Sequence, residues 1–292
     1  MLLHSFWIFF YRTYDLSERK LNTKRIILPT FGALTLLFAM VSAISTTPQS
    51  ASAFPYTCLD AKTGGKAPMV ISDKNLYVAW WGNGTGNFEV IFKASNDNGK
   101  TFGDKINLSN STNGTSGAAS VAASGNNVYV TYWDNKTGIG RVYVRTSNDN
   151  GKTFEPEITL TDYTPISSVP YPQTKEGLAK LTPYELKIAA GGDNVYVIAK
   201  GAENVKNITS PSDIFIRTSN DNGKTFGEEI NLSNSTGIQS TRAEIVASGD
   251  NVDVSWWEKS DGKDQPMIRT SNDGGKTFGE ATVLTANSTS SS

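Results

Sequence analysis

Short apolar segments recur along this chain at regular intervals, and each one ends in a polar turn. The segments come in groups of four, are rich in Val, Ile, Tyr and Trp, and are bounded by Gly, Asn and Asp. Runs of this length and composition predict β-strands joined by tight turns. No segment after residue 53 has a convincing helical period. The first segments of the four groups are APMVIS, AASVAAS, LKIAAG and AEIVAS, at 67–72, 118–124, 186–191 and 243–248.

A nearly identical octapeptide separates the third segment of each group from the fourth. It reads SNDNGKTF at 95–102, 147–154 and 219–226 and SNDGGKTF at 271–278, so successive copies start 52, 72 and 52 residues apart. Four short antiparallel strands repeated at such an interval are typical of a β-propeller blade. We therefore predict an all-β fold, a β-propeller of four four-stranded antiparallel blades over 66–286. The predicted blades cover about 66–110, 117–161, 184–233 and 242–286.

The octapeptide pattern S-x-D-x-G-x-T-F resembles the Asp box (BNR repeat), known from sialidases and other β-propellers. In that family the motif forms the turn between the third and fourth strands of a blade. The resemblance implies an aspartate that accepts backbone N–H bonds, a glycine with positive φ and a phenylalanine that covers the apolar end of the blade. These residues are Asp97, Asp149, Asp221 and Asp273; Gly99, Gly151, Gly223 and Gly275; and Phe102, Phe154, Phe226 and Phe278.

The number of blades does not decide between a monomer and a dimer. Four blades are the small end of the range for closed propellers, so one chain can form a complete ring. A half-ring completed by a second chain, and hence a homodimer, is the other way to protect exposed sheet edges.

The N-terminus has the pattern of an export signal. Basic residues precede an apolar run at 26–44, and the small-x-small sequence Ala51-Ser52-Ala53 follows it, which predicts cleavage after Ala53. An uncleaved membrane anchor is the alternative, because such a run can just span a bilayer. Both interpretations predict a secreted protein or one on the extracellular face of the cell membrane.

Three further segments lie outside the predicted blades. Residues 1–20 are unusual for a signal's basic leader, and we interpret them as an artefact of start-codon assignment. Residues 54–65 are interpreted as a linker and 287–292 as a tail.

Composition excludes several functions. A net charge of −1 gives no indication of nucleic-acid binding. The only histidine is His4 and the only cysteine is Cys58, so residues 54–292 hold neither an internal disulfide nor a His/Cys zinc site. We expect no cofactor; calcium is compatible with the Asp- and Asn-rich loops, but no spacing specifies a site.

Binding residues are expected where the repeats differ. The octapeptide side of each blade is nearly constant, whereas the loops between the second and third strands vary, and variable loops on a rigid scaffold commonly carry function. The charged and aromatic residues predicted at that side are Lys66, Trp81, Glu185, Lys187, Arg242, Glu244 and Trp257. The alternative is a compensating set of structural charges with core tryptophans.

The family resemblance also allows a sialidase hypothesis. That activity needs three clustered arginines, a tyrosine nucleophile paired with a glutamate, and an acid/base aspartate. The best matches are Arg141, Arg242, Tyr184 and Glu185, which are one arginine short, and adjacent strand residues point to opposite faces. The sequence therefore favours a binding or structural module for glycans or surface proteins over a sialidase-type glycoside hydrolase.

Nine sequons of the form N-x-[ST] occur along the chain and suit an exported glycoprotein. Chance is the alternative in a sequence so rich in Asn, Ser and Thr. The sequons expected to carry glycans are Asn83, Asn113, Asn135, Asn207 and Asn234.

Overall fold

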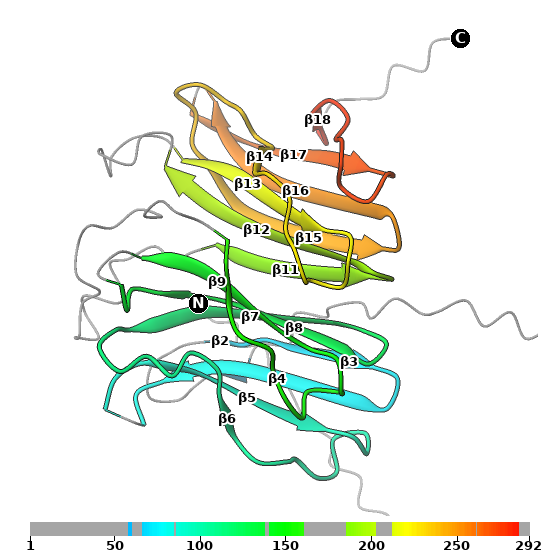
Figure 1. Cartoon of the computed structure of the whole chain (residues 1–292). Helices are drawn as coiled ribbons and strands as arrows, with labels where there is room; N and C mark the ends of the chain where they lie inside the picture. The colour runs from blue at the N-terminus through cyan, green and yellow to red at the C-terminus, as the bar shows by residue number, and fades with distance from the viewer. Residues whose placement is uncertain are drawn as a thin grey trace, which may run out of the picture. The chain divides into compact units, whose positions relative to one another are not determined.

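The computed structural model describes residues 58–59, 66–84, 86–137, 140–160, 185–202, 212–260 and 262–285. All of them belong to one compact unit, Thr47–Ser292. The predicted signal or anchor, the tail and the long insertion between the second and third repeats lie outside the described residues. Every regular element that is described is a β-strand (Figure 1). In this part of the chain no helix is long and apolar enough to span a membrane.

The described strands form four antiparallel sheets of four strands each (Figure 1). Within each sheet the strands pair in chain order. The prediction of four four-stranded antiparallel sheets is therefore confirmed, and the arrangement is consistent with a four-blade propeller-like fold. Sheet one holds β3 (Met69–Ser72), β4 (Asn75–Gly82), β5 (Glu89–Ser95) and β6 (Ile106–Asn107); sheet two holds β7 (Ser116–Ser124), β8 (Asn127–Asp134), β9 (Arg141–Ser147) and β10 (Ile158–Thr159).

The second half of the chain repeats this arrangement. A short additional pair, β1 (Cys58–Leu59) and β2 (Lys66–Ala67), precedes sheet one, so that two residues of the predicted linker are in a strand. Sheet three holds β11 (Leu186–Gly191), β12 (Asn194–Ala202), β13 (Ser212–Ser219) and β14 (Ile230–Asn231); sheet four holds β15 (Ser240–Ser248), β16 (Asn251–Ser260), β17 (Lys263–Ser271) and β18 (Thr282–Val283).

The octapeptide forms the turn between the third and fourth strands by one set of hydrogen bonds. In the first copy the Ser95 hydroxyl donates to the Asp97 carboxylate (2.7 Å) and accepts from the Gly99 N–H (2.9 Å). The carboxylate also accepts from the N–H (2.9 Å) and the hydroxyl (2.6 Å) of Thr101. The same bonds recur in the other three copies. The octapeptide is thus a repeated folding unit.

These bonds stabilise the ionised form of each aspartate. Hydrogen bonds from Thr101 and Ser95 lower the pKa of Asp97 to about 2. Partial burial opposes the effect at Asp149 and Asp221, but the hydrogen bonds of the turn prevail and their pKa is also about 2.

Adjacent sheets pack face to face, and the extensive contacts between sheets follow chain order. One hydrophobic cluster fills each of the three interfaces. A tyrosine from the second strand of the earlier sheet reaches across each interface. The Tyr77 hydroxyl donates to Asn150 Oδ1 (3.3 Å), and the Tyr196 hydroxyl donates to the Gly249 carbonyl (3.1 Å). Burial raises the pKa of both tyrosines to about 12.

The phenylalanines of the octapeptides lie in these interfaces, against the preceding sheet as well as their own. Phe154 meets Phe92 of sheet one edge to face, with 4.9 Å between ring centroids. Phe226 and Phe278 pack against the other two clusters. Phe102 belongs to the first of the four sheets and is 42% exposed. The sequence predicted only that each ring covers the apolar end of a blade, and the structure adds that the preceding sheet contributes to its burial.

Candidate functional site

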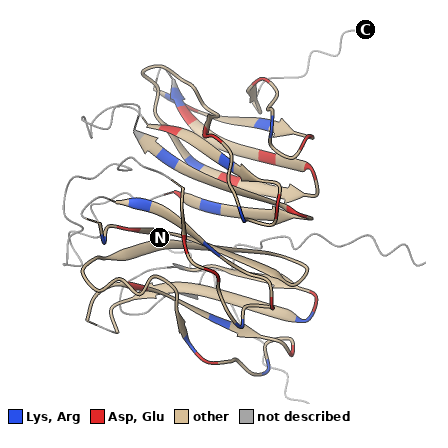
Figure 2. Ribbon diagram, viewed as in Figure 1, with Lys and Arg blue, Asp and Glu red and all other residues tan. Residues whose placement is uncertain are grey.

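Each sheet has two chemically different ends. The octapeptide end carries the turns between the first and second strands and between the third and fourth strands. The variable end carries the connections between the second and third strands and those between sheets. Figure 2 shows residues of both charge signs on the strands of sheets three and four, where most of the predicted binding residues are found.

Charged side chains at the variable end of sheets three and four form contacts between the sheets. Lys187 Nζ of β11 lies 2.8 Å from Glu244 Oε1 of β15. Glu185, just before β11, accepts a hydrogen bond from the Ala243 N–H (3.0 Å). The other carboxylate oxygen of Glu185 lies 4.0 Å from Lys200 Nζ. Four residues predicted from sequence, Glu185, Lys187, Arg242 and Glu244, therefore sit where two sheets meet.

Lys200 is a member of this cluster that the sequence analysis missed. It is 7% exposed, and a buried ammonium group requires a nearby carboxylate. It takes the place of Trp81 and Trp133 in sheets one and two, in a strand that otherwise reads as apolar. That replacement of an aromatic residue by lysine was the available signal. We call Glu185, Lys187, Lys200, Arg242 and Glu244 the charged inner edge.

Arg242 has an unusual backbone conformation. It lies in a β-bulge of β15, between Thr241 and Glu244, with a φ of 55°. Positive φ is uncommon for a residue other than glycine, and bulges reorient side chains next to functional sites. The Arg242 side chain is exposed, and no hydrogen bond or ion pair within the described ranges engages it. Ala118 occupies the equivalent bulge of sheet two, with a φ of 52°.

The predicted aromatic residues do not converge on this cluster. Trp133 and Trp256 are fully buried. Trp81 is half-buried and packs on the cluster between sheets one and two. Trp257 is 37% exposed, and it lies opposite Thr241 on the face of sheet four that points away from sheet three. Lys66 lies in β2, and its side chain is outside the described part of the chain.

The residues of the hydrolase alternative are dispersed. Glu185 and Arg242 lie in neighbouring sheets, Arg141 opens β9 in sheet two, and Tyr184 is outside the described residues. Arg145 is part of the scaffold, because its guanidinium donates to the carbonyls of Leu108, Phe154 and Glu155 (2.8–3.1 Å). Arg217 likewise donates to the Gly227 carbonyl (3.2 Å).

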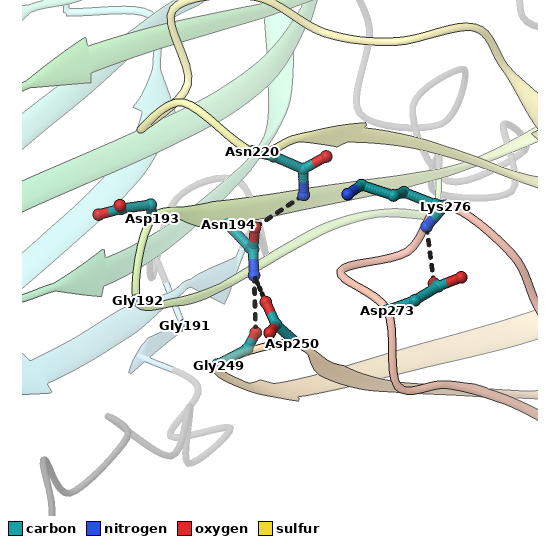
Figure 3. Close-up of a pocket in the computed structure, with 9 residues that line it drawn as sticks. All are labelled: Gly191, Gly192, Asp193, Asn194, Asn220, Gly249, Asp250, Asp273 and Lys276. Atoms are coloured by element: carbon teal, nitrogen blue, oxygen red, sulfur yellow. Dashed lines mark hydrogen bonds between the residues drawn. The ribbon is translucent and has the colours of Figure 1, made fainter.

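A cavity of about 510 Å³ lies at the octapeptide end, between sheets three and four (Figure 3). The Asn194 amide donates there to the Gly249 carbonyl (3.0 Å) and to Asp250 (2.8 Å), and the Asn220 amide donates to Asn194 Oδ1 (2.7 Å). The fourth octapeptide has Gly274 where the other three have asparagine, and the Asn220 amide donates to the Gly274 carbonyl (2.9 Å). Since these amides hydrogen-bond one another, we interpret the cavity as a feature of the repeat. Its lining comprises Gly191, Gly192, Asp193, Asn194, Asn220, Gly249, Asp250, Asp273 and Lys276.

A second repeated motif escaped the sequence analysis. The segment INLSNST occurs at 106–112 and at 230–236, and a buried carboxylate anchors each copy. Glu89, 3% exposed, accepts from the Ser111 N–H (3.0 Å) and from the Ser109 hydroxyl. Asp213 accepts from the Ser233 hydroxyl (2.6 Å) in the same way. The repeat of seven residues was a detectable signal, but only the fold shows the partner of each serine.

The sequons differ in accessibility. Asn83, Asn113 and Asn234 are exposed. Asn135 is half-buried, and its side-chain oxygen accepts from the Thr115 N–H (2.8 Å). Asn207 lies outside the described residues. Within those residues, no group of three or more Asp, Glu, His or Cys side chains is arranged to hold a metal ion.

Comparison with known proteins shows similarity in structure only. The sequence matches no family model and no curated protein. A protein of unknown function from Dyadobacter fermentans DSM 18053 is 15% identical over 74% of this chain and 67% of that chain, with a TM-score of 0.50. The shared property is the fold.

Two sialidases are also similar in structure. Hadza microbial sialidase Hz136 is 13% identical over 73% of this chain and 45% of that chain, with a TM-score of 0.45. Trypanosoma rangeli sialidase is 13% identical over 73% of this chain and 36% of that chain, with a TM-score of 0.46. The chain spans less than half the length of either sialidase.

Proposed function

We propose that the chain is an exported, surface-associated propeller that binds a glycan or a surface protein at the charged inner edge, without catalysis. The observation that carries this proposal is the exposed guanidinium of Arg242, held on a bulge beside the Lys187–Glu244 contact between sheets. A guanidinium presents several planar donors and suits carboxylate or hydroxyl groups of a ligand. Strained backbone at a non-glycine residue is concentrated at binding sites.

The surroundings of the two carboxylates favour binding over hydrolysis. Glu244 faces Lys187, and Glu185 faces Lys200 and accepts a backbone N–H. A general acid for glycoside hydrolysis needs a carboxyl group in apolar surroundings and a second carboxylate across the scissile bond. The Lys187–Glu244 contact and the hydrogen bond from Ala243 to Glu185 instead join two sheets, and the Glu185–Lys200 contact lies within sheet three.

A binding experiment tests the proposal directly. The exported protein is applied to immobilised acidic and neutral glycans and to proteins from the cell surface. We expect Arg242→Ala to weaken binding about tenfold or more, as for the loss of one charged contact. Lys276→Ala removes an exposed cation at the octapeptide end and serves as the matched control. Equal binding by both variants and the parent protein would contradict a site at the charged inner edge.

A sialidase-type exo-glycoside hydrolase is the second candidate, supported by Glu185 and Arg242 in neighbouring sheets. This candidate uses Arg141 and Tyr184 as further site residues. Turnover of a fluorogenic sialoside, abolished by Arg242→Ala and retained by Lys276→Ala, would replace the binding proposal with this one.

Export and modification are further parts of the proposal. We infer that the chain starts at Phe54 after cleavage and lies outside the cell or on the extracellular face of its membrane. Mass spectrometry of the native protein measures both the N-terminal peptide and any glycan on Asn83, Asn113 or Asn234.

A further inference from the structure

The exposed large apolar side chains of the described residues all lie on two surfaces. Ile71 (57% exposed) and Phe102 (42%) belong to sheet one. Val246 (61%), Trp257 (37%) and Leu284 (54%) belong to sheet four. These sheets are the first and the last of the series (Figure 1), and the exposed residues lie on the faces that no other four-stranded sheet of the described residues covers. We call them the outward face of sheet one and the outward face of sheet four.

The same repeat positions are buried where a neighbouring sheet is present. Leu284 corresponds to Leu108, Leu160 and Leu232, which are at most 2% exposed. Val246 corresponds to Val70 in sheet one, which is 3% exposed. At these two positions the outward face of sheet four therefore carries residues of the kind that fill the interior interfaces, and apolar surface of this kind marks an association site.

Two of the three interior interfaces share a set of polar contacts, whereas between sheets three and four Gly191 replaces the serine and the Asn194 amide donates to Gly249 and Asp250 instead. Between sheets one and two, the Ser72 hydroxyl donates to the Gly125 carbonyl (3.2 Å) and the Asn75 amide donates to Asn150 Oδ1 (3.1 Å). Sheets two and three repeat both contacts, with Ser124 to the Gly192 carbonyl (2.9 Å) and Asn127 to Asn222 (2.8 Å).

The outward faces carry one half of this set each. Sheet four ends with the donors Ser248 and Asn251, both exposed. Sheet one has the acceptors: Asp73 with a φ of 53° and Asn98 with a φ of 61°, the conformations that Gly125 (57°) and Asn150 (61°) adopt in the first interface. Both side chains are exposed. The donors of this set of contacts thus lie on sheet four and the acceptors on sheet one, at opposite ends of the series of sheets.

We propose that two copies of this chain associate, with the outward face of sheet four of one copy packed on the outward face of sheet one of the other. We call this contact the seam. The new contact repeats the interior one, with Ser248 donating to the Asp73 carbonyl and Asn251 donating to Asn98. Two copies can form two identical seams of this kind about a twofold axis, which leaves no face unpaired. Among the described residues the extensive contacts join only consecutive sheets, so no other four-stranded sheet described in the same copy occupies either outward face.

One substitution distinguishes this seam from the interior interfaces. Asp253 occupies the position of the bridging tyrosines Tyr77, Tyr129 and Tyr196. A carboxylate buries less apolar area than a tyrosine ring, and placing it at an interface costs free energy unless it is paired. The seam is therefore weaker than the interior interfaces, and the dimer is in equilibrium with the monomer.

Sedimentation of the exported protein over a range of concentrations is the first test. We expect a mass twice that of the chain at high concentration. Asp253→Tyr restores the residue of the repeat and lowers the dissociation constant about tenfold or more. Ile71→Asp and Trp257→Asp, on opposite faces of the seam, each give a monomer, whereas Gln239→Asp adds the same charge on an exposed loop and leaves the dimer intact. Monomers at all concentrations for both the parent protein and Asp253→Tyr would overturn the proposal.

Cross-linking determines which faces meet and uses variants that keep the apolar contacts of the seam. In a Cys58→Ser background, one preparation carries Asn98→Cys and another carries Asn251→Cys, and a short bis-maleimide is added. We expect a covalent dimer only when the two preparations are mixed. A covalent dimer from the Asn98→Cys preparation alone would show that sheet one packs on itself, which contradicts the proposed seam.

Discussion

At the scale of single residues, glycines in two kinds of turn meet different requirements: Gly275 lies in an octapeptide turn and Gly125 in the turn between β7 and β8. Gly275 has a φ of 74°, and a Cβ at this position would lie 2.7 Å from Thr218 Oγ1 and 2.9 Å from Tyr196 Cε1. Gly125 has a φ of 57°, and a Cβ there would meet nothing within 4 Å. The first glycine is thus required by both backbone conformation and packing, and the second by conformation alone.

This difference predicts the effects of two matched substitutions. Gly275→Ala should lower the free energy of unfolding by about 2–3 kcal/mol, since it combines backbone strain with overpacking. Gly125→Ala should cost about 1 kcal/mol through backbone strain alone. Urea denaturation of both variants measures the difference. Equal losses of unfolding free energy in the two variants would show that the side chains around Gly275 move to accommodate the methyl group at no cost.

Glu229 predicts a pH dependence at the same scale. Burial raises its pKa from 4.5 to about 7. A carboxyl group with a raised folded-state pKa contributes stability that is fully present below the unfolded-state pKa and lost as the pH rises through the folded-state pKa. Glu229→Gln should therefore stabilise the protein at pH 8 by about 1 kcal/mol, after allowance for solvent that still reaches the group, and leave stability at pH 4 nearly unchanged. Urea midpoints at the two pH values test this, with Glu228→Gln, an exposed neighbour, as control.

At the scale of elements, the octapeptide turn forms through one carboxylate. Asp149 accepts from the N–H groups of Lys152 and Thr153 and from the hydroxyls of Ser147 and Thr153. The turn connects a long third strand to a two-residue fourth strand, β10. Because β10 adds so few ladder bonds, the carboxylate supplies much of what holds the fourth strand in place.

Loss of that carboxylate should be visible in acid. The pKa of Asp149 is lowered to about 2, so its contribution to stability is present above the unfolded-state value of about 4 and lost as the pH falls through about 2. Asp149→Asn should cost roughly 1 kcal/mol at pH 7, a figure that allows for exposure of the group. The variant and the parent should converge in stability near pH 2. A constant difference across this range would assign the loss to geometry and not to charge.

At the scale of the whole molecule, the sheets differ in how much of each is covered. Sheets two and three are packed on both faces, whereas sheets one and four each retain one outward face. Local opening is easier where fewer buried contacts hold the backbone.

Hydrogen exchange should therefore proceed unevenly along the chain. At low protein concentration we expect the amides of β8 and β12 to exchange more slowly than those of β4 and β16. Raising the concentration should slow exchange in β4 and β16 selectively, because seam formation covers their outward faces. Exchange rates that do not vary with concentration would mean that β4 and β16 exchange faster only because of their place in the fold, and this result would contradict the seam.

Much of the architecture was accessible from sequence because the repeat is internal. Four copies of the octapeptide mark the turn between the third and fourth strands of each sheet, and runs rich in Val, Ile, Tyr and Trp bounded by Gly, Asn and Asp predict the strands themselves. The bulge at Arg242 was not predicted. A bulge depends on the pairing between β15 and β16, and the residue type at the bulge, Ala118 in one sheet and arginine in another, gives no local indication of it.

The sequence by itself determined the number of sheets, their strand order and the chemistry of the turns, since each depends on residues close together in the chain. The tertiary structure alone decided which sheet each phenylalanine covers, that Lys200 is buried opposite Glu185, and that Trp257 faces away from sheet three. These properties depend on the surface of a neighbouring sheet. Contacts between sheets join residues that are far apart in the chain, such as Lys187 and Glu244, and no local pattern of hydrophobic and polar residues specifies them.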